Sequence, residues 1–208
     1  MGYWSKSGDE LYDAAMQAVS KRDGAKAIEL FHAAADRGHA DAHACLGTIY
    51  MKGRSVPPDP RRGFQHLLKA AEKGVPESQF NAALCYRNGN GVPVDHHAAY
   101  RWFEKASKAN IPPAFTCLGL AHYNGEGVPQ DFTRAFQYFL RGAELQDSDS
   151  EWNVFHMLMH GEGVAKDVHR AIPFLERAAE HGHPDAVEFQ RSRHTGMIDM
   201  NYWGRRDP

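Results

Sequence analysis

Apolar residues recur at intervals of three and four through most of the chain, which is the spacing of one buried face on an α-helix. In the first such stretch Leu11, Ala15 and Val19 follow Asp9, a residue type that favours helix starts. The pattern predicts paired helices over residues 9–22 and 24–36, 40–52 and 60–73, 77–88 and 96–109, 113–124 and 132–145, and 149–160 and 168–181, and a lone helix over 184–195.

One glycine-rich motif separates the two helices of most pairs. Asn-Gly-Glu-Gly-Val-Pro-Gln-Asp occupies residues 124–131, near-copies occupy 88–95 and 160–167, and a weaker copy runs over 53–59. Glycine ends a helix, proline cannot continue one, and aspartate caps the next. The closing aspartates, Asp59, Asp95, Asp131 and Asp167, recur every 36 residues (95 − 59 and so on). A fixed period of this length indicates stacked structural repeats.

The same period aligns small residues with bulky ones. Ala27, Gly63, Ala99, Ala135 and Ala171 share one column, and large side chains such as Phe31, Phe103 and Phe139 share another. Small side chains next to large ones are typical of helices that pack against each other. We therefore expect an all-α solenoid of about five antiparallel helix pairs and a terminal capping helix over residues 9–196. It has an N-terminal extension over 1–8 and a C-terminal tail over 197–208, which is interpreted as a cap, a disordered end or a partner contact.

Composition and charge limit the kinds of partner that the protein is expected to bind. The 208 residues are 42% hydrophobic, enough for a sizeable core in one elongated domain. A formal charge of −2 argues against broad binding to nucleic acid or an anionic membrane, and no apolar run is long enough to span a membrane. The start does not resemble a signal peptide, and three cysteines suggest free thiols. A cytoplasmic location is expected, or a periplasmic or secreted one if a signal peptide had been removed.

Several columns at this spacing resemble the Sel-one-like repeat (SLR) family, a branch of the tetratricopeptide-like helical repeats. The matching residues are Ala42, Leu46-Gly47 and Tyr50, the motif Gly-x-Gly-Val-Pro-x-Asp, Ala99, Trp102-Phe103, Lys105-Ala106 and the stretch from Glu176 to Gly182. The resemblance covers roughly residues 25–196. It implies a right-handed superhelix of helix pairs that serves as a protein-interaction scaffold.

The resemblance also implies that the first helix of each pair lines a concave surface that binds a protein or peptide partner. Aromatic residues and arginine are enriched at binding hot spots. The predicted partner-binding residues are Arg87, Asn88, Tyr123, Asn124, Trp152, His156 and His160. Phe80, Leu84 and Leu120 face the same way, with packing between repeats as the alternative.

One repeat departs from the pattern. Val154-Phe155 stands where two other repeats have Leu-Gly, at 46–47 and 118–119. The acidic residues 146–151 before it are expected to form a loop. A large ring in a close helix contact is costly, so the substitution predicts a splayed or rotated helix. The alternatives are drift with compensating packing and a specialised partner-binding repeat.

Catalysis and metal binding have little support in the sequence. His39 with His43, and His156 with His160, place two imidazoles on one helix face, but the sequence supplies no third ligand and no His-Glu-x-x-His motif. Some cysteine-rich relatives bind or hydrolyse β-lactams, yet their paired cysteines and a Ser-x-x-Lys stretch are missing here. We expect a non-enzymatic protein without metal or cofactor. The alternatives are a dedicated inhibitor, such as an immunity protein for a secreted toxin, and a metal-dependent or β-lactam-recognising enzyme.

Overall fold

The computed structural model describes residues 5–194, and no strand occurs within that range. Its helices form two compact units by their internal contacts, unit 1 up to Ala106 and unit 2 from Ser107. Each unit is described by itself. The all-α architecture of consecutive helix pairs that the sequence predicts is confirmed, whereas a single continuous domain over residues 9–196 stays a prediction. The predicted tail, 197–208, lies outside the described residues.

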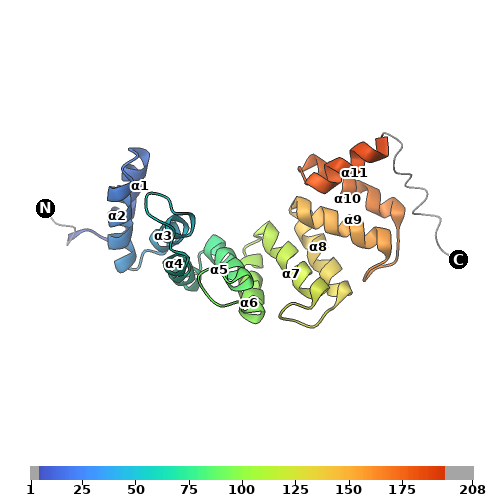
Figure 1. Ribbon diagram of the computed structural model, residues 1–208, viewed down its shortest axis with the longest axis horizontal. Coiled ribbons are helices and arrows are strands. Elements are labelled where there is room, and N and C mark those ends of the chain that lie inside the picture. The colour runs from blue at the N-terminus through green and yellow to red at the C-terminus, as the bar shows by residue number, and fades with distance from the viewer. Residues whose placement is uncertain (1–4, 195–208) are drawn as a thin grey trace. The chain divides into compact units, whose positions relative to one another are not determined.

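Unit 1 consists of three helix pairs, coloured blue to green in Figure 1. The pairs are α1 (Gly8–Ser20) with α2 (Gly24–Asp36), α3 (Ala40–Lys52) with α4 (Pro60–Glu72), and α5 (Pro76–Asn88) with α6 (His96–Ser107). Each helix begins and ends within about two residues of the predicted bounds, because the capping residues are explicit in the sequence.

Unit 2 consists of two further pairs and a closing helix, coloured green to red in Figure 1. They are α7 (Pro112–Asn124) with α8 (Phe132–Glu144), α9 (Ser148–His160) with α10 (Val168–Glu180), and α11 (Pro184–His194). No helix in the described part of the chain is long and apolar enough to cross a membrane.

The periodic aspartates join the two helices of a pair through both their backbone and their side chains. Each aspartate amide donates to a carbonyl of the first helix at 2.9 Å, on Tyr50, Tyr86, His122 and Leu158 in turn. Each carboxylate accepts from a backbone N–H in the first turn of the second helix, at 2.9–3.0 Å. The expectation that Asp59, Asp95, Asp131 and Asp167 cap helices is confirmed.

In two copies of the motif, the second glycine lets the connecting loop pack on the preceding repeat. Gly91 has a φ of +79°, and a Cβ there would lie 2.1 Å from the carbonyl oxygen of Pro60. Gly163 has a φ of +68°, and a Cβ there would lie 2.3 Å from the carbonyl oxygen of Phe132. Only glycine tolerates both the left-handed backbone and the close approach. The loop therefore fixes the spacing of successive pairs within each unit.

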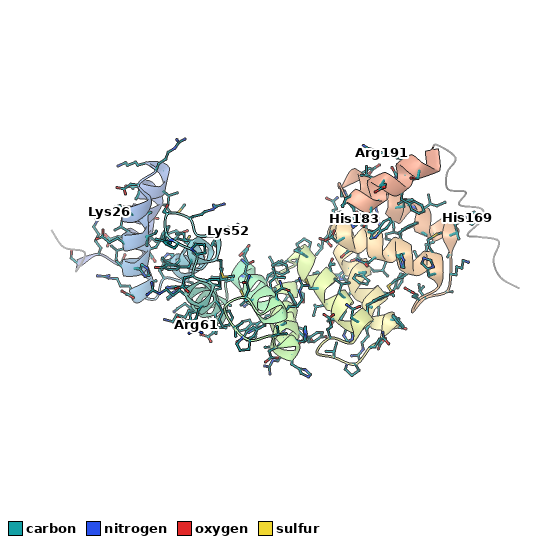
Figure 2. The ribbon with its side chains drawn as sticks, in the orientation of Figure 1. Lys26, Lys52, Arg61, His169, His183 and Arg191 are labelled. Atoms are coloured by element: carbon teal, nitrogen blue, oxygen red, sulfur yellow. The ribbon has the colours of Figure 1, made fainter. Side chains whose placement is uncertain are left out.

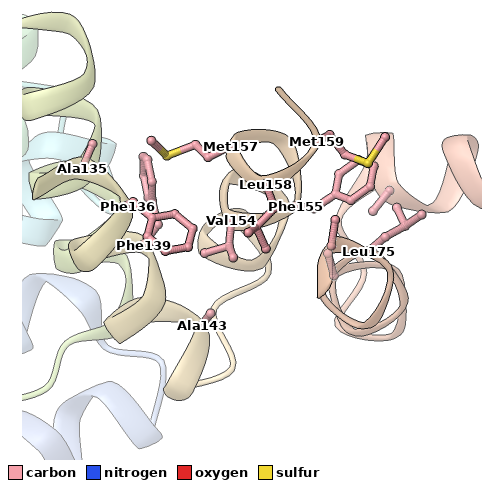
Figure 3. Packing of buried hydrophobic residues seen from close by; sticks show 13 residues of the cluster. Ala135, Phe136, Phe139, Ala143, Val154, Phe155, Met157, Leu158, Met159 and Leu175 are labelled. Carbon is pink, nitrogen blue, oxygen red and sulfur yellow. The ribbon is translucent and has the colours of Figure 1, made fainter. Parts of the chain in front are cut away.

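Small residues of first helices lie against large residues of second helices. A Cβ on Gly119 would lie 2.5 Å from Cε1 of Phe139, and one on Gly47 would lie 2.7 Å from Cγ of Leu67. In unit 2 the resulting core runs from Ala135 to Ala186 (Figure 3). Gly47 and Gly119 belong to a different column from the small residues named from the sequence, Ala27, Gly63, Ala99, Ala135 and Ala171, which lie on second helices.

Phe155 occupies the position that Gly47 and Gly119 hold in two earlier repeats, and Ala83 in a third. Its ring lies 5.2 Å from Trp152 and 5.4 Å from Phe189 of α11, measured between centroids. Figure 3 shows Phe155 near Met159 and Leu175. The ring is thus fully packed by the last helices of unit 2, and the predicted splaying of α9 stays a prediction.

The prediction that residues 146–151 form a loop before α9 is wrong for residues 148–151. α9 begins at Ser148, so Ser148–Glu151 form its first turn, and Asp147 caps the helix by accepting from the amide of Ser150 at 2.9 Å. Glu151 is fully buried. Acidic residues favour the first turn of a helix because they interact with the positive end of its dipole.

Candidate functional site

An open apolar pocket lies on the first helices of unit 1. Its cavity of about 370 Å³ is bounded by α1, α3 and α5. Its lining is mainly aliphatic and aromatic, with one base and one acid at its edge: Met16, Val19, Phe31, Ala44, Cys45, Thr48, Ile49, Arg54, Glu77, Ser78 and Asn81. We call this cavity the apolar pocket.

A second, more polar pocket adjoins it between α3 and α5. Its cavity measures about 260 Å³. Its lining combines apolar residues, Met51, Leu67, Leu84 and Cys85, with polar ones that we call its polar rim, Thr48, Lys52, Asn81, Asn88 and Asn90. We call this the amide pocket. Because Thr48 and Asn81 line both cavities, the two are immediate neighbours, and we call them together the unit 1 groove.

Helical spacing explains why these side chains share one face. Cys45, Thr48 and Lys52 are three and four residues apart on α3, and Asn81 and Asn88 are seven apart on α5. On α1, Met16 and Val19 are 44% and 48% exposed, which is unusual for large apolar side chains in this protein. Val19 was expected on the buried face of α1 and instead borders the groove.

The polar rim of the amide pocket retains hydrogen-bonding capacity. Thr48 Oγ1 donates to the carbonyl of Ala44 at 3.1 Å, and Asn88 Oδ1 accepts from Arg87 Nε at 3.3 Å. Within residues 5–194, the side chains of Lys52, Asn81 and Asn90 have no hydrogen bond or ion pair. The rim therefore offers several N–H donors to a ligand.

The predicted binding residues of unit 1 differ in their surroundings. Asn88 lines the amide pocket, as the sequence predicts for a groove residue. The guanidinium of Arg87 lies 5.7 Å from the ring centroid of Phe103 on α6, which directs it toward the second helix of its own pair. A role for Arg87 in partner binding stays a prediction.

Three predicted residues of unit 2, Tyr123, His156 and His160, lie toward the C-terminal ends of α7 and α9. Tyr123 donates to Glu162 at 2.9 Å, and His156 Nδ1 lies 3.8 Å from the same carboxylate. The rings of His156 and His160 are 4.3 Å apart. Burial lowers the pKa of His156, and His160 lowers it further, while the negative charge of Glu162 acts in the opposite direction.

The two remaining predicted residues of unit 2 make local contacts. Asn124 donates to Glu126 at 3.1 Å and is exposed. Trp152 lies between α9 and α11, stacked on His183 at 5.1 Å and edge-on to Phe189 at 6.2 Å. This packing gives Trp152 a structural role, and its binding role stays a prediction.

Of the two histidine pairs noted in the sequence, His156 and His160 stay in contact, whereas His39 and His43 turn to different partners. His39 caps α3 by accepting from the amide of Ala42 at 3.2 Å, while His43 contacts His66 on α4. Among the residues that the structure describes, no group of three or more His, Cys, Asp or Glu is arranged to hold a metal ion. All three cysteines are free thiols.

Sequence reasoning missed much of the unit 1 groove. It named no residue of α1 and overlooked Asn81 and Asn90. The usable signal for Asn81 was helical spacing, because Asn81 lies three and seven residues before Leu84 and Asn88, on the same helical face.

Solved structures resemble this fold. A protective antigen from uropathogenic Escherichia coli with an SLR fold matches with a TM-score of 0.82 and 27% identity, over 86% of this chain and 39% of its own. A Sel1 repeat protein from Oxalobacter formigenes gives 0.76 and 26%, over 78% and 67%. The chain thus spans well under half of the E. coli antigen. No curated protein matches the sequence.

An immunity protein from Pseudomonas aeruginosa also matches, with a TM-score of 0.51 and 22% identity, over 89% of this chain and 69% of its own. At that identity the likeness shows the fold alone. The Sel1 repeat model matches residues 15–39, 40–75, 76–111, 118–147 and 148–183, which together make up most of the chain. These five matches agree with the 36-residue period and the helix pairs, and the chain belongs to the Sel1 repeat family.

Proposed function

We propose that this protein is a non-catalytic adaptor that binds a segment of a partner protein in the unit 1 groove. Sel1 repeat proteins generally mediate protein–protein interactions, and their fold is typically a non-enzymatic scaffold. The observation that carries the proposal is that the two pockets adjoin each other, since Thr48 and Asn81 line both. Two adjoining pockets suit a chain segment with successive side chains better than a compact small molecule.

The composition of the groove supports a polypeptide ligand. Apolar side chains of the partner would bury Met16 and Val19, which are about half exposed, and burial of apolar surface is favourable by about 25 cal/mol per Å². Main-chain groups of an extended segment need hydrogen-bond partners when they leave water. Amide side chains such as Asn81 can both donate and accept, so they suit an extended backbone.

Site-specific crosslinking in the native cells tests this function. The full chain would carry p-benzoylphenylalanine in place of Asn81, or in place of Gln65, an exposed residue of α4 outside both pockets. We expect a partner that crosslinks from position 81 and not from position 65, with the crosslink confined to one segment of that partner.

A binding measurement with the purified partner completes the test. Val19→Glu should weaken binding at least about tenfold, because it places a charge in an apolar contact. Gln17→Glu, an exposed change outside the groove on the same helix, should have little effect. Equal affinities for these two variants would contradict the proposal. The double variant Arg87→Glu with Trp152→Ala separately tests the binding residues predicted from the sequence.

A further inference from the structure

The residues that line the amide pocket carry a positive charge and no negative one. Lys52 is the only ionisable side chain with a formal charge among the residues that line it, and no aspartate or glutamate does. The apolar pocket next to it has one cation and one acid, Arg54 and Glu77. The excess positive charge of the groove therefore lies at the amide pocket.

Further nitrogen donors line the same pocket as this charge. Lys52 carries three N–H donors, and the amides of Asn81 and Asn90 add further donors without an intramolecular acceptor among the described residues. The amide of Asn88 uses its oxygen to accept from Arg87, which leaves its N–H₂ group for a ligand. Hydrogen bonds from such donors to an ionised acceptor are the strong ones.

The helix ends nearby do not cancel this charge. α3 and α5 both end at the amide pocket, and helix C-termini carry partial negative charge. In each helix the following glycine, Gly53 or Gly89, donates its amide back to a carbonyl of the last turn. Each of the two helix ends carries at most about half a negative charge, which the capping amide reduces, so the two together weaken the ammonium charge of Lys52 but do not reverse it.

We infer that the segment bound in the unit 1 groove carries a carboxylate that occupies the amide pocket, opposite Lys52. This inference rests on the proposed function and adds the chemistry of the partner. The carboxylate belongs either to an aspartate or glutamate side chain or to a free C-terminus. A phosphate group fits less well, because phosphate sites are typically built from clustered arginines, and the pocket lining contains none.

The apolar pocket then selects the neighbouring residue of the segment. Because the two cavities share Thr48 and Asn81, a large apolar side chain that enters the apolar pocket lies close in sequence to the carboxylate. The expected ligand is a short acidic peptide with an adjacent aliphatic or aromatic residue.

Peptide binding to the full chain tests the inference even while the partner is unidentified. An array of random decapeptides is probed with the protein, and each binder is resynthesised with a free C-terminal carboxylate, with a C-terminal amide, and with Asn or Gln in place of every Asp and Glu. Fluorescence anisotropy then gives Kd for the wild type, Lys52→Glu and Arg61→Glu. Arg61 is an exposed cation of α4 that lines neither pocket (Figure 2).

We expect removal of the carboxylate to weaken binding at least about threefold, and Lys52→Glu to weaken it about tenfold or more. Arg61→Glu should change Kd less than about twofold, and the wild-type Kd should rise with salt concentration. The C-terminal amide peptides show which source of carboxylate is used. If only they lose affinity, the terminus is recognised, and if only the Asn and Gln forms do, a side chain is.

The outcomes separate this inference from the proposed function. Peptides that lose affinity with Val19→Glu, yet bind equally well without carboxylates or to Lys52→Glu, would overturn the inference and leave the groove as a binding site. If no peptide in the array is sensitive to Val19→Glu, the proposed function fails and the inference fails with it.

Discussion

Nδ1 of His43 on α3 lies 2.9 Å from Nδ1 of His66 on α4. Between two neutral imidazoles, one ring donates this hydrogen bond and the other accepts it, whereas two protonated rings would both be donors. His32 of α2 joins them, with its ring 5.6 Å from that of His66 and its Nε2 2.9 Å from the hydroxyl of Tyr50. Three helices of unit 1 thus meet at three neighbouring histidines.

The surroundings favour the neutral form of all three rings. Burial is the main cause and lowers the pKa of His66 to about 4, with His43, His32 and Lys69 adding to the shift and Asp36 opposing it. The pKa values of His43 and His32 are also lowered, mainly by burial. The other charged groups that act on the three rings are Lys73 and Arg62 of α4.

The first prediction is that unit 1 loses stability in mild acid. The histidines of the unfolded chain bind protons below pH 6.5, while the folded state resists protonation until about pH 4, so the free energy of unfolding falls as the pH falls through this window. One pKa unit corresponds to about 1.4 kcal/mol. Because water screens the partly buried rings, we expect a loss of about 1–2 kcal/mol.

Urea unfolding between pH 7.5 and 4.5 measures this loss, with hydrogen exchange over residues 24–73 to locate it. His66→Gln should flatten the pH dependence, and His97→Gln, which changes an exposed histidine of α6, should leave it unchanged. A His66→Gln protein with the wild-type pH dependence would contradict the assignment.

The second prediction concerns the loop glycine of the last motif. Gly163→Ala should destabilise unit 2 by about 2–4 kcal/mol, because it combines a left-handed φ of +68° with a Cβ only 2.3 Å from the backbone of Phe132. Gly182→Ala is the control, since Gly182 has a φ of +87° but no atom within 4 Å of its Cβ position. Thermal unfolding should show a clearly larger loss for Gly163→Ala, and equal losses would refute the close approach.

The third prediction concerns the buried carboxylate of α9. Glu151 is 0% exposed, its Oε2 lies 2.7 Å from His181 Nδ1, and its Oε1 lies 3.2 Å from Arg177 Nε without hydrogen-bond alignment. Glu151→Gln removes the charge that both partners on α10 share, and should cost about 1–3 kcal/mol. Glu176→Gln, on the exposed side of α10, should cost less than about 0.5 kcal/mol. Chemical denaturation of both variants measures these losses. A Glu151→Gln protein as stable as the wild type would show that the ion pair contributes nothing to stability.

The fourth prediction concerns thiol reactivity. Burial raises the pKa of the Cys85 thiol to about 11, so at pH 8 only about one thiol in a thousand is ionised, and the thiolate is the reactive form. Cys85 should therefore resist iodoacetamide in the folded protein and react in urea, as mass spectrometry of the labelled peptides would show. Cys45 is less buried and should be labelled before Cys85. Rapid labelling of Cys85 in the native state would contradict its burial.

The sequence predicts the helices well because their boundaries depend on local chemistry. Glycine, proline and aspartate occur at the turn positions where their conformational preferences act, so the bounds follow from spacing alone. The sequence predicts contacts between different helices less well. The contact between His43 and His66 joins residues from different columns of the repeat, which a 36-residue period does not relate.

Burial of a charge is equally hidden from a periodic pattern. Glu151 stands where the equivalent positions hold His43, Gln79 and Phe115, and only the partners on α10 make a carboxylate tolerable there. The rim of the amide pocket depends in the same way on which side chains remain without intramolecular partners, a property of the folded surroundings of Asn81 and Asn90.

The periodic aspartates have an evolutionary consequence. The amide and the carboxylate of Asp59 both act inside one helix pair, as do those of Asp95. Excision of residues 60–95 would leave Asp59 next to His96, with Ala98 taking the place of Arg62 as the amide donor. A gene with this repeat can therefore lose or gain one whole repeat at a time. At each new junction, an aspartate would still cap the second helix and bond to the first.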